Sequence, residues 1–119
     1  MTGSGGGGSE IRQLARYEVR PQALGRCLAA IHEFVAHVRA SEPGTLRYEV
    51  WQEAGHPTRF VHRFVFRDAA AQRAHSASAD VEKFASTLYP ECLAPVEFTD
   101  YVLVDTKRER ATGGDGGAG

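Results

Sequence analysis

Four stretches of the chain alternate between apolar and polar residues with the two-residue period that is typical of β-strands. They cover residues 11–19, 45–53, 60–66 and 96–104. The third stretch is the richest in aromatic and β-branched side chains, which favour strands. Because alternate side chains point to opposite faces of a sheet, one face of this strand should carry Phe60, His62, Phe64 and Phe66.

The second stretch has large side chains on both faces. By strict alternation one face carries Leu46, Tyr48 and Val50, and the other carries Arg47, Glu49 and Trp51. Tyr48 and Trp51 therefore cannot line the same cavity unless a bulge interrupts the strand. We expect Tyr48 to face a pocket, where a phenol can orient a substrate oxygen, and Trp51 to lie at an interface between subunits.

Apolar residues at three- and four-residue intervals predict helices between these strands. The first helix follows Pro21, stops near residues 41–44 and has the stripe Leu24, Leu28, Ile31, Val35 and Val38. Asp68 is a good N-cap for an Ala-rich helix. A further helix, over residues 81–88, has the stripe Val81, Phe84, Ala85 and Leu88. His75 lies between these two helical pieces.

The predicted elements follow the order β-α-β-β-α-β, with the second helix in two pieces and a hairpin turn at residues 54–57. This order is typical of the ferredoxin-like α+β fold, an antiparallel four-stranded sheet with its helices on one face. The other face also carries large apolar side chains, including Trp51 and Val65. Since monomers rarely expose such patches, we expect a homodimer in which two sheets pack together.

Composition defines one domain over residues 10–111, between Gly-rich stretches at 1–9 and 112–119 that we interpret as flexible tails. The net charge of −1 and the absence of a basic stripe argue against nucleic acid as a partner. No apolar run approaches the length of a membrane span, and residues 1–9 lack the hydrophobic region of a signal peptide. We therefore expect a cytoplasmic protein that does not bind membranes.

The chain lacks the common metal and nucleotide motifs. It has no H-E-x-x-H, no C-x-x-C, no calcium-loop spacing and no glycine fingerprint between a strand and a helix. No metal site is expected, although residues far apart in the sequence could still converge. Cys27 should be a small buried residue beside the first helical stripe. A disulfide between Cys27 and Cys92 is the alternative, which a cytosolic setting disfavours.

Three segments resemble the antibiotic biosynthesis monooxygenase domain: LRYEV at residues 46–50, RFV at 59–61 and FRDAAAQRAHSAS at 66–78. The resemblance extends over nearly all of residues 11–104. It implies a dimeric α+β barrel, and small cofactor-independent oxygenases that act on quinols are among the members of this family. Members usually carry a Glu and a second His at the positions of Phe64 and Asp80, so this chain departs from the family pattern at both.

The resemblance implies a monooxygenase that needs no cofactor and oxidises a quinol-like or polycyclic aromatic, polyketide-type substrate with O2. In this interpretation His75 is the base and Tyr48 orients the substrate, a hydrophobic aromatic small molecule. The substrate-binding residues would be His62, Phe64, Phe66, Phe84 and Leu88. From residue type and spacing alone, a helix-end histidine bonded to backbone is the favoured interpretation of His75, and a hydrogen-bonded core or interface residue that of His62.

Two other functions fit the same sequence. The chain could be a non-catalytic dimeric barrel that binds a hydrophobic small molecule. It could also be a polyketide isomerase or cyclase, which needs a base but no oxygen. Oxygen consumption with a quinol would separate the oxygenase from both alternatives, and product formation without oxygen would identify the isomerase or cyclase.

Overall fold

A computed structural model describes residues 9–107. The stretches interpreted as tails, 1–9 and 112–119, lie outside this range apart from Ser9, as do residues 108–111. The strands are β1 (Ile11–Glu18), β2 (Thr45–Glu53), β3 (His56–Phe66) and β4 (Glu97–Tyr101). The helices are α1 (Leu24–Ser41), α2 (Ala69–Ser76) and α3 (Ala79–Leu88), with short 3-10 turns η2 (Pro21–Ala23) and η3 (Tyr89–Glu91).

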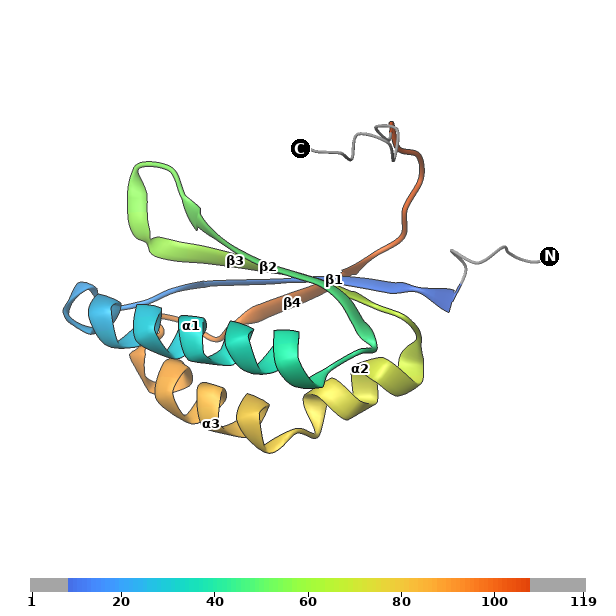
Figure 1. Ribbon diagram of the computed structural model, residues 1–119. Helices are drawn as coiled ribbons and strands as arrows, with labels where there is room; N and C mark the ends of the chain where they lie inside the picture. Colours follow the sequence, from blue (N-terminus) through green and yellow to red (C-terminus); the bar gives the residue numbers. More distant parts are fainter. Residues whose placement is uncertain (1–8, 108–119) are drawn as a thin grey trace, which may run out of the picture.

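The four strands form one antiparallel sheet in the order β2-β3-β1-β4. All three helices lie against one face of this sheet, and the opposite face has no helix over it (Figure 1). This arrangement confirms the ferredoxin-like α+β prediction. The pairing of Ala15 with His62, and of Tyr17 with Phe60, places the aromatic positions of β3 on the helix face.

Side-chain caps explain why the second helical region is split. Asp68 Oδ1 accepts a hydrogen bond from the Ala71 N–H at 2.9 Å, which begins α2. Ser78 Oγ accepts one from the Val81 N–H at 3.0 Å, which begins α3. Such caps satisfy amide groups that have no partner within the helix. The predicted break is therefore present, but His75 does not lie between the two helices: it is in the last turn of α2.

The predicted alternation of β2 is wrong at Leu46. The pairing of β2 with β3 shifts register between Thr45 and Arg47, so an extra residue interrupts the alternation. Leu46 consequently falls outside the alternation of the strand. It is 49% exposed and lines a surface depression of about 730 Å³, together with Arg47 and Val65.

The predicted last strand, residues 96–104, is longer than the observed β4. β4 is an edge strand that pairs only with β1, and the pairing ends with Tyr101 opposite Arg12. Because β1 begins at Ile11, the chain after Tyr101 has almost no partner strand left. Val102 and Val104 are accordingly 89% and 95% exposed.

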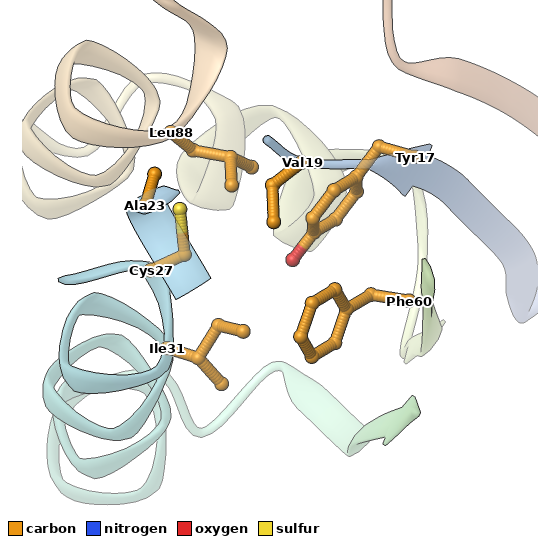
Figure 2. Packing of buried hydrophobic residues seen from close by; sticks show 7 residues of the cluster. All are labelled: Tyr17, Val19, Ala23, Cys27, Ile31, Phe60 and Leu88. Carbon is orange, nitrogen blue, oxygen red and sulfur yellow. The ribbon is translucent and has the colours of Figure 1, made fainter. Parts of the chain in front are cut away.

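The core between sheet and helices consists of two clusters. The first joins β1 and β3 to α1 and α3, and Figure 2 shows its buried members: Tyr17, Val19, Ala23, Cys27, Ile31, Phe60 and Leu88. The second cluster contains Ala15, Phe64 and Phe66, with Tyr48 and Ala71 packed against it. Cys27 is fully buried, as predicted, and both cysteines are free thiols.

Among residues 9–107, no helix combines the length and the apolar character needed to cross a bilayer.

Candidate functional site

His75 is a buried histidine whose ring is bonded to a carboxylate. Its Nδ1 lies 2.7 Å from Glu42 Oε1, and both side chains are about nine-tenths buried. Within the described chain, Nε2 of the same ring has no hydrogen-bond partner. The ring of His75 is therefore bonded to an acidic side chain and not, as a helix-end histidine would be, to backbone.

Aromatic rings surround the His75 imidazole on several sides. The ring centroids of Phe66, Phe64 and Phe34 lie 5.1, 5.4 and 5.6 Å from that of His75. Tyr48, predicted to orient the substrate, follows at 6.3 Å with its ring nearly perpendicular. The structure thus brings together the two residues predicted to be catalytic, and it places both in an apolar environment.

Glu42 is held in place from several directions. It ends α1, where its N–H donates to the Val38 carbonyl at 3.1 Å, and its own carbonyl accepts from the Thr45 N–H at 3.0 Å. The Thr45 hydroxyl also donates to Oε1 at 2.8 Å. The second oxygen, Oε2, lies 3.5 Å from His37 Nε2, which is too far for a good hydrogen bond.

His37 connects this carboxylate to the protein surface. Its Nδ1 lies 3.0 Å from Oδ2 of Asp80, a side chain that is 44% exposed. Asp80 occupies the position at which the family resemblance implied a second histidine. In this chain the second imidazole near the site comes from α1.

Glu42 reaches His75 because the loop between α1 and β2 packs closely on α2. The Gly44 carbonyl accepts a hydrogen bond from the Arg67 N–H at 2.8 Å. A Cβ atom at position 44 would lie only 2.6 Å from the Ala71 Cβ. Glycine is therefore required at position 44 for this close approach.

His62 lies between two phenols in the centre of the core. The Tyr17 hydroxyl is 2.6 Å from its Nε2, and the Tyr48 hydroxyl is 2.7 Å from its Nδ1. Burial lowers the pKa of His62 to about 3, so the ring is neutral and one nitrogen donates while the other accepts. Burial also raises the pKa of both phenols above their usual range. This geometry matches the interpretation of His62 as a hydrogen-bonded core residue.

A groove of about 360 Å³ lies beside the buried cluster, where α1 ends and β2 begins. Tyr48 and Glu42 both line it, with Val35 and Val38 of α1. This volume is within the range of small-molecule sites. Phe64, Phe66 and His75 do not line the groove, and they pack behind Tyr48 and Glu42.

The other two residues predicted to bind substrate lie in different places. Phe84 stacks on Phe34 with the ring centroids 4.9 Å apart, and it lies 5.8 Å from His62. Leu88 belongs to the first core cluster, with Tyr17 and Cys27, so the structure does not bring it to His75.

Sequence reasoning missed Glu42, His37, Phe34 and Tyr17 as neighbours of the predicted site. Phe34 continues the stripe of α1 three residues after Ile31, so its burial could have been foreseen. Glu42 lies 33 residues from His75 and gave no local signal. Residues 9–107 contain no group of three or more His, Cys, Asp or Glu side chains arranged to hold a metal ion.

Comparisons with known proteins agree with this fold. A protein from Mycobacterium tuberculosis is 21% identical with a TM-score of 0.75, and the match covers 84% of this chain and 100% of that one. A candidate antibiotic biosynthesis monooxygenase from Bacteroides thetaiotaomicron is 20% identical with a TM-score of 0.79, covering 88% of this chain and 99% of that one. At such identities the likeness shows a shared fold. Among curated proteins there is no significant match.

The sequence itself matches a family model. The match to the antibiotic biosynthesis monooxygenase family extends over residues 10–87, which is more than half of the chain and includes Tyr48, His62 and His75. This chain therefore belongs to the antibiotic biosynthesis monooxygenase family.

Proposed function

We propose that the protein is a cofactor-independent monooxygenase that oxidises a quinol-like or polycyclic aromatic substrate with O2. Family membership supports the reaction class. The observation that carries the proposal is the placement of an imidazole, His75, and a phenol, Tyr48, side by side among aromatic rings and next to a groove. An apolar site of this kind favours reactions in which a phenol becomes a reactive anion shielded from water.

The reaction begins when His75 accepts the proton of a substrate hydroxyl. The resulting electron-rich anion passes an electron to O2, so the substrate supplies the redox chemistry. For a substrate with a reactive methylene group, the balance is RH2 + O2 → RO + H2O: one oxygen atom becomes a carbonyl and the other leaves as water. The protein contributes the base, the orientation and the apolar surroundings.

Tyr48 can orient the substrate oxygen when His62 adopts one of its two neutral tautomers. If Nδ1 of His62 donates to the Tyr48 oxygen and Nε2 accepts from Tyr17, the Tyr48 O–H remains free to donate. Because burial raises the pKa of Tyr48, its phenol keeps its proton at neutral pH. It therefore acts as a neutral hydrogen-bond donor to the developing oxyanion.

Oxygen uptake by the purified protein tests this function. Anthrones and reduced naphthoquinones are supplied in the presence of a metal chelator, and uptake is compared with autoxidation. We expect stimulated uptake that falls on the order of 100-fold in His75→Ala. His56→Ala is the matched control, since His56 is about half exposed in the β2–β3 hairpin. Equal rates in the wild type and His75→Ala would contradict the assignment of the base.

A second candidate is a barrel that binds a hydrophobic aromatic molecule without oxidising it. It is favoured by another groove, of about 480 Å³, between η3 and β4 and away from His75. This groove is lined by Tyr89, Cys92, Leu93, Ala94, Pro95, Val96 and Phe98. Tight binding without oxygen uptake would favour this candidate, and product formation without oxygen would favour an isomerase or cyclase.

We also propose that the protein is a homodimer whose sheets face each other. The sheet face opposite the helices is uncovered in one chain and carries Trp51, which is 60% exposed. The exposed Val102–Val104 segment continues from β4 beside it. Light scattering after size-exclusion chromatography should give twice the chain mass, and Trp51→Glu should give a monomer. A wild-type monomer at micromolar concentration would contradict this proposal.

A further inference from the structure

Glu42 has no role in the proposed reaction as described above, yet it makes the shortest polar contact of His75. We propose that Glu42 is the positioning residue of His75: it keeps a proton on Nδ1 and thereby presents the lone pair of Nε2 as the base. This inference rests on the proposed function for its catalytic consequence. The positioning itself is a property of the resting protein.

The chemistry of a carboxylate determines which tautomer of His75 is bound. An ionised carboxylate can only accept hydrogen bonds, so the nitrogen facing it must carry the hydrogen. At 2.7 Å, Glu42 Oε1 requires Nδ1–H, and the neutral ring then has its lone pair on Nε2. Without Glu42, a neutral imidazole in the same place is free to adopt either tautomer.

The surroundings of Glu42 make it a rigid support. Its backbone N–H and carbonyl are both bonded, and Oε1 accepts a further hydrogen bond from the Thr45 hydroxyl. His37 approaches the other oxygen and is itself next to Asp80. Glu42 thus lies between two imidazoles, and its side chain has little freedom to turn away from His75.

This arrangement assigns one step to each group. The substrate proton moves to Nε2 of His75, and the Glu42 carboxylate faces the imidazolium that forms, which it stabilises. The proton on Nε2 then passes to the oxygen that leaves as water, so His75 returns to its starting state. Glu42 keeps its charge throughout and exchanges no proton.

Nitrogen NMR of the ¹⁵N-labelled protein tests the proposal directly. At a pH at which His75 is neutral, its ring signals, assigned by their loss in His75→Ala, should report Nδ1–H in the wild type. They should move toward the Nε2–H tautomer in Glu42→Ala. Glu33→Ala, which removes an exposed carboxylate on α1 that is paired with Lys83, is the control and should leave the signals unchanged. An Nε2–H tautomer in the wild type, or unchanged signals in Glu42→Ala, would overturn the proposal.

A conservative variant separates positioning from folding. In Glu42→Gln the amide oxygen can still accept from Nδ1–H, so this variant should keep the wild-type tautomer even if Glu42→Ala folds poorly. In the oxygen-uptake assay, Glu42→Ala should lower kcat on the order of 100-fold with little change in KM. Glu42→Gln should lie between Glu42→Ala and the wild type.

The two proposals fail in different ways. If no substrate stimulates oxygen uptake, the proposed function is wrong, and the NMR experiment still decides whether Glu42 sets the tautomer. If the wild type oxidises a substrate through His75 but Glu42→Ala retains full kcat, the positioning role of Glu42 is wrong and the proposed function stands.

Discussion

Two buried histidines lie in the same aromatic core, but their partners differ. His62 is 2% exposed and its ring nitrogens bond only to neutral phenols, whereas His75 is 8% exposed and is bonded to a carboxylate. His62 is neutral because burial lowers its pKa to about 3, and both of its nitrogens are occupied. His75 keeps one nitrogen available. The comparison shows that two buried histidines of one core can differ in what their ring nitrogens bind: both nitrogens of His62 face phenols, whereas only Nδ1 of His75 has a partner within the described chain.

The largest expected difference between the two histidines is in their contribution to the stability of the fold. His62→Ala removes a ring that fills the core and leaves the hydroxyls of Tyr17 and Tyr48 without their partner. We expect a loss of about 3–5 kcal/mol in the free energy of unfolding, measured by urea denaturation. The exposed His56→Ala variant should lose less than about 0.5 kcal/mol. If His62→Ala also lost less than about 0.5 kcal/mol, the hydroxyls of the two tyrosines would have found other hydrogen-bond partners.

The pH dependence of stability follows from the same difference. The pKa of His62 is about 3 in the folded chain and 6.5 when unperturbed. Below pH 6.5 the unfolded state therefore binds the extra proton, and stability falls as the pH falls toward 3. Between pH 6.5 and 4.5 this residue should account for a loss of about 2 kcal/mol, measured by denaturation at each pH.

A variant isolates the contribution of His62 to this pH dependence. In His62→Gln the loss of stability over the same pH range should be smaller by about 2 kcal/mol, because glutamine does not titrate. A pH dependence identical to that of the wild type would show that other groups cause it.

The smallest effect distinguishes the two phenols that contact His62. Tyr17→Phe and Tyr48→Phe each leave one ring nitrogen of His62 unpaired, so each should cost about 1–2 kcal/mol of stability. Only Tyr48 lines the groove beside His75, so only Tyr48→Phe should also lower kcat/KM in the oxygen-uptake assay. Equal loss of activity in both variants would mean that the whole Tyr17–His62–Tyr48 unit, rather than the Tyr48 hydroxyl, supports the reaction.

The fold could be predicted from the sequence because the patterns that define its strands and helices involve residues close together in the chain. Alternation in β3 placed Phe60, His62, Phe64 and Phe66 on one face, and Asp68 marked the start of α2. Two predictions about strands were wrong, and in both the pairing with a neighbouring strand determines the structure. The extra residue at Leu46 is defined by its pairing with β3, and β4 ends where β1 has no more residues to pair with.

The candidate site was predicted only in part, because its polar contacts join distant segments. Tyr48, His62 and His75 were singled out by residue type and by resemblance, and the structure brings them together. In the sequence Glu42 is only part of the predicted helix stop at residues 41–44, and His37 carries no signal of a site. No periodicity links position 42 to position 75, so their contact became visible only once the loop after α1 was placed against α2.

The close approach of Gly44 to Ala71 has an evolutionary consequence. Gly44 touches neither His75 nor the groove, yet any side chain there would push the loop that carries Glu42 away from α2. Selection on the carboxylate–imidazole pair would therefore act on position 44 as well. Across the family we expect these three positions to vary together: a glycine should stand at position 44 where Glu and His stand at positions 42 and 75, and other residues should occur there where the pair is absent.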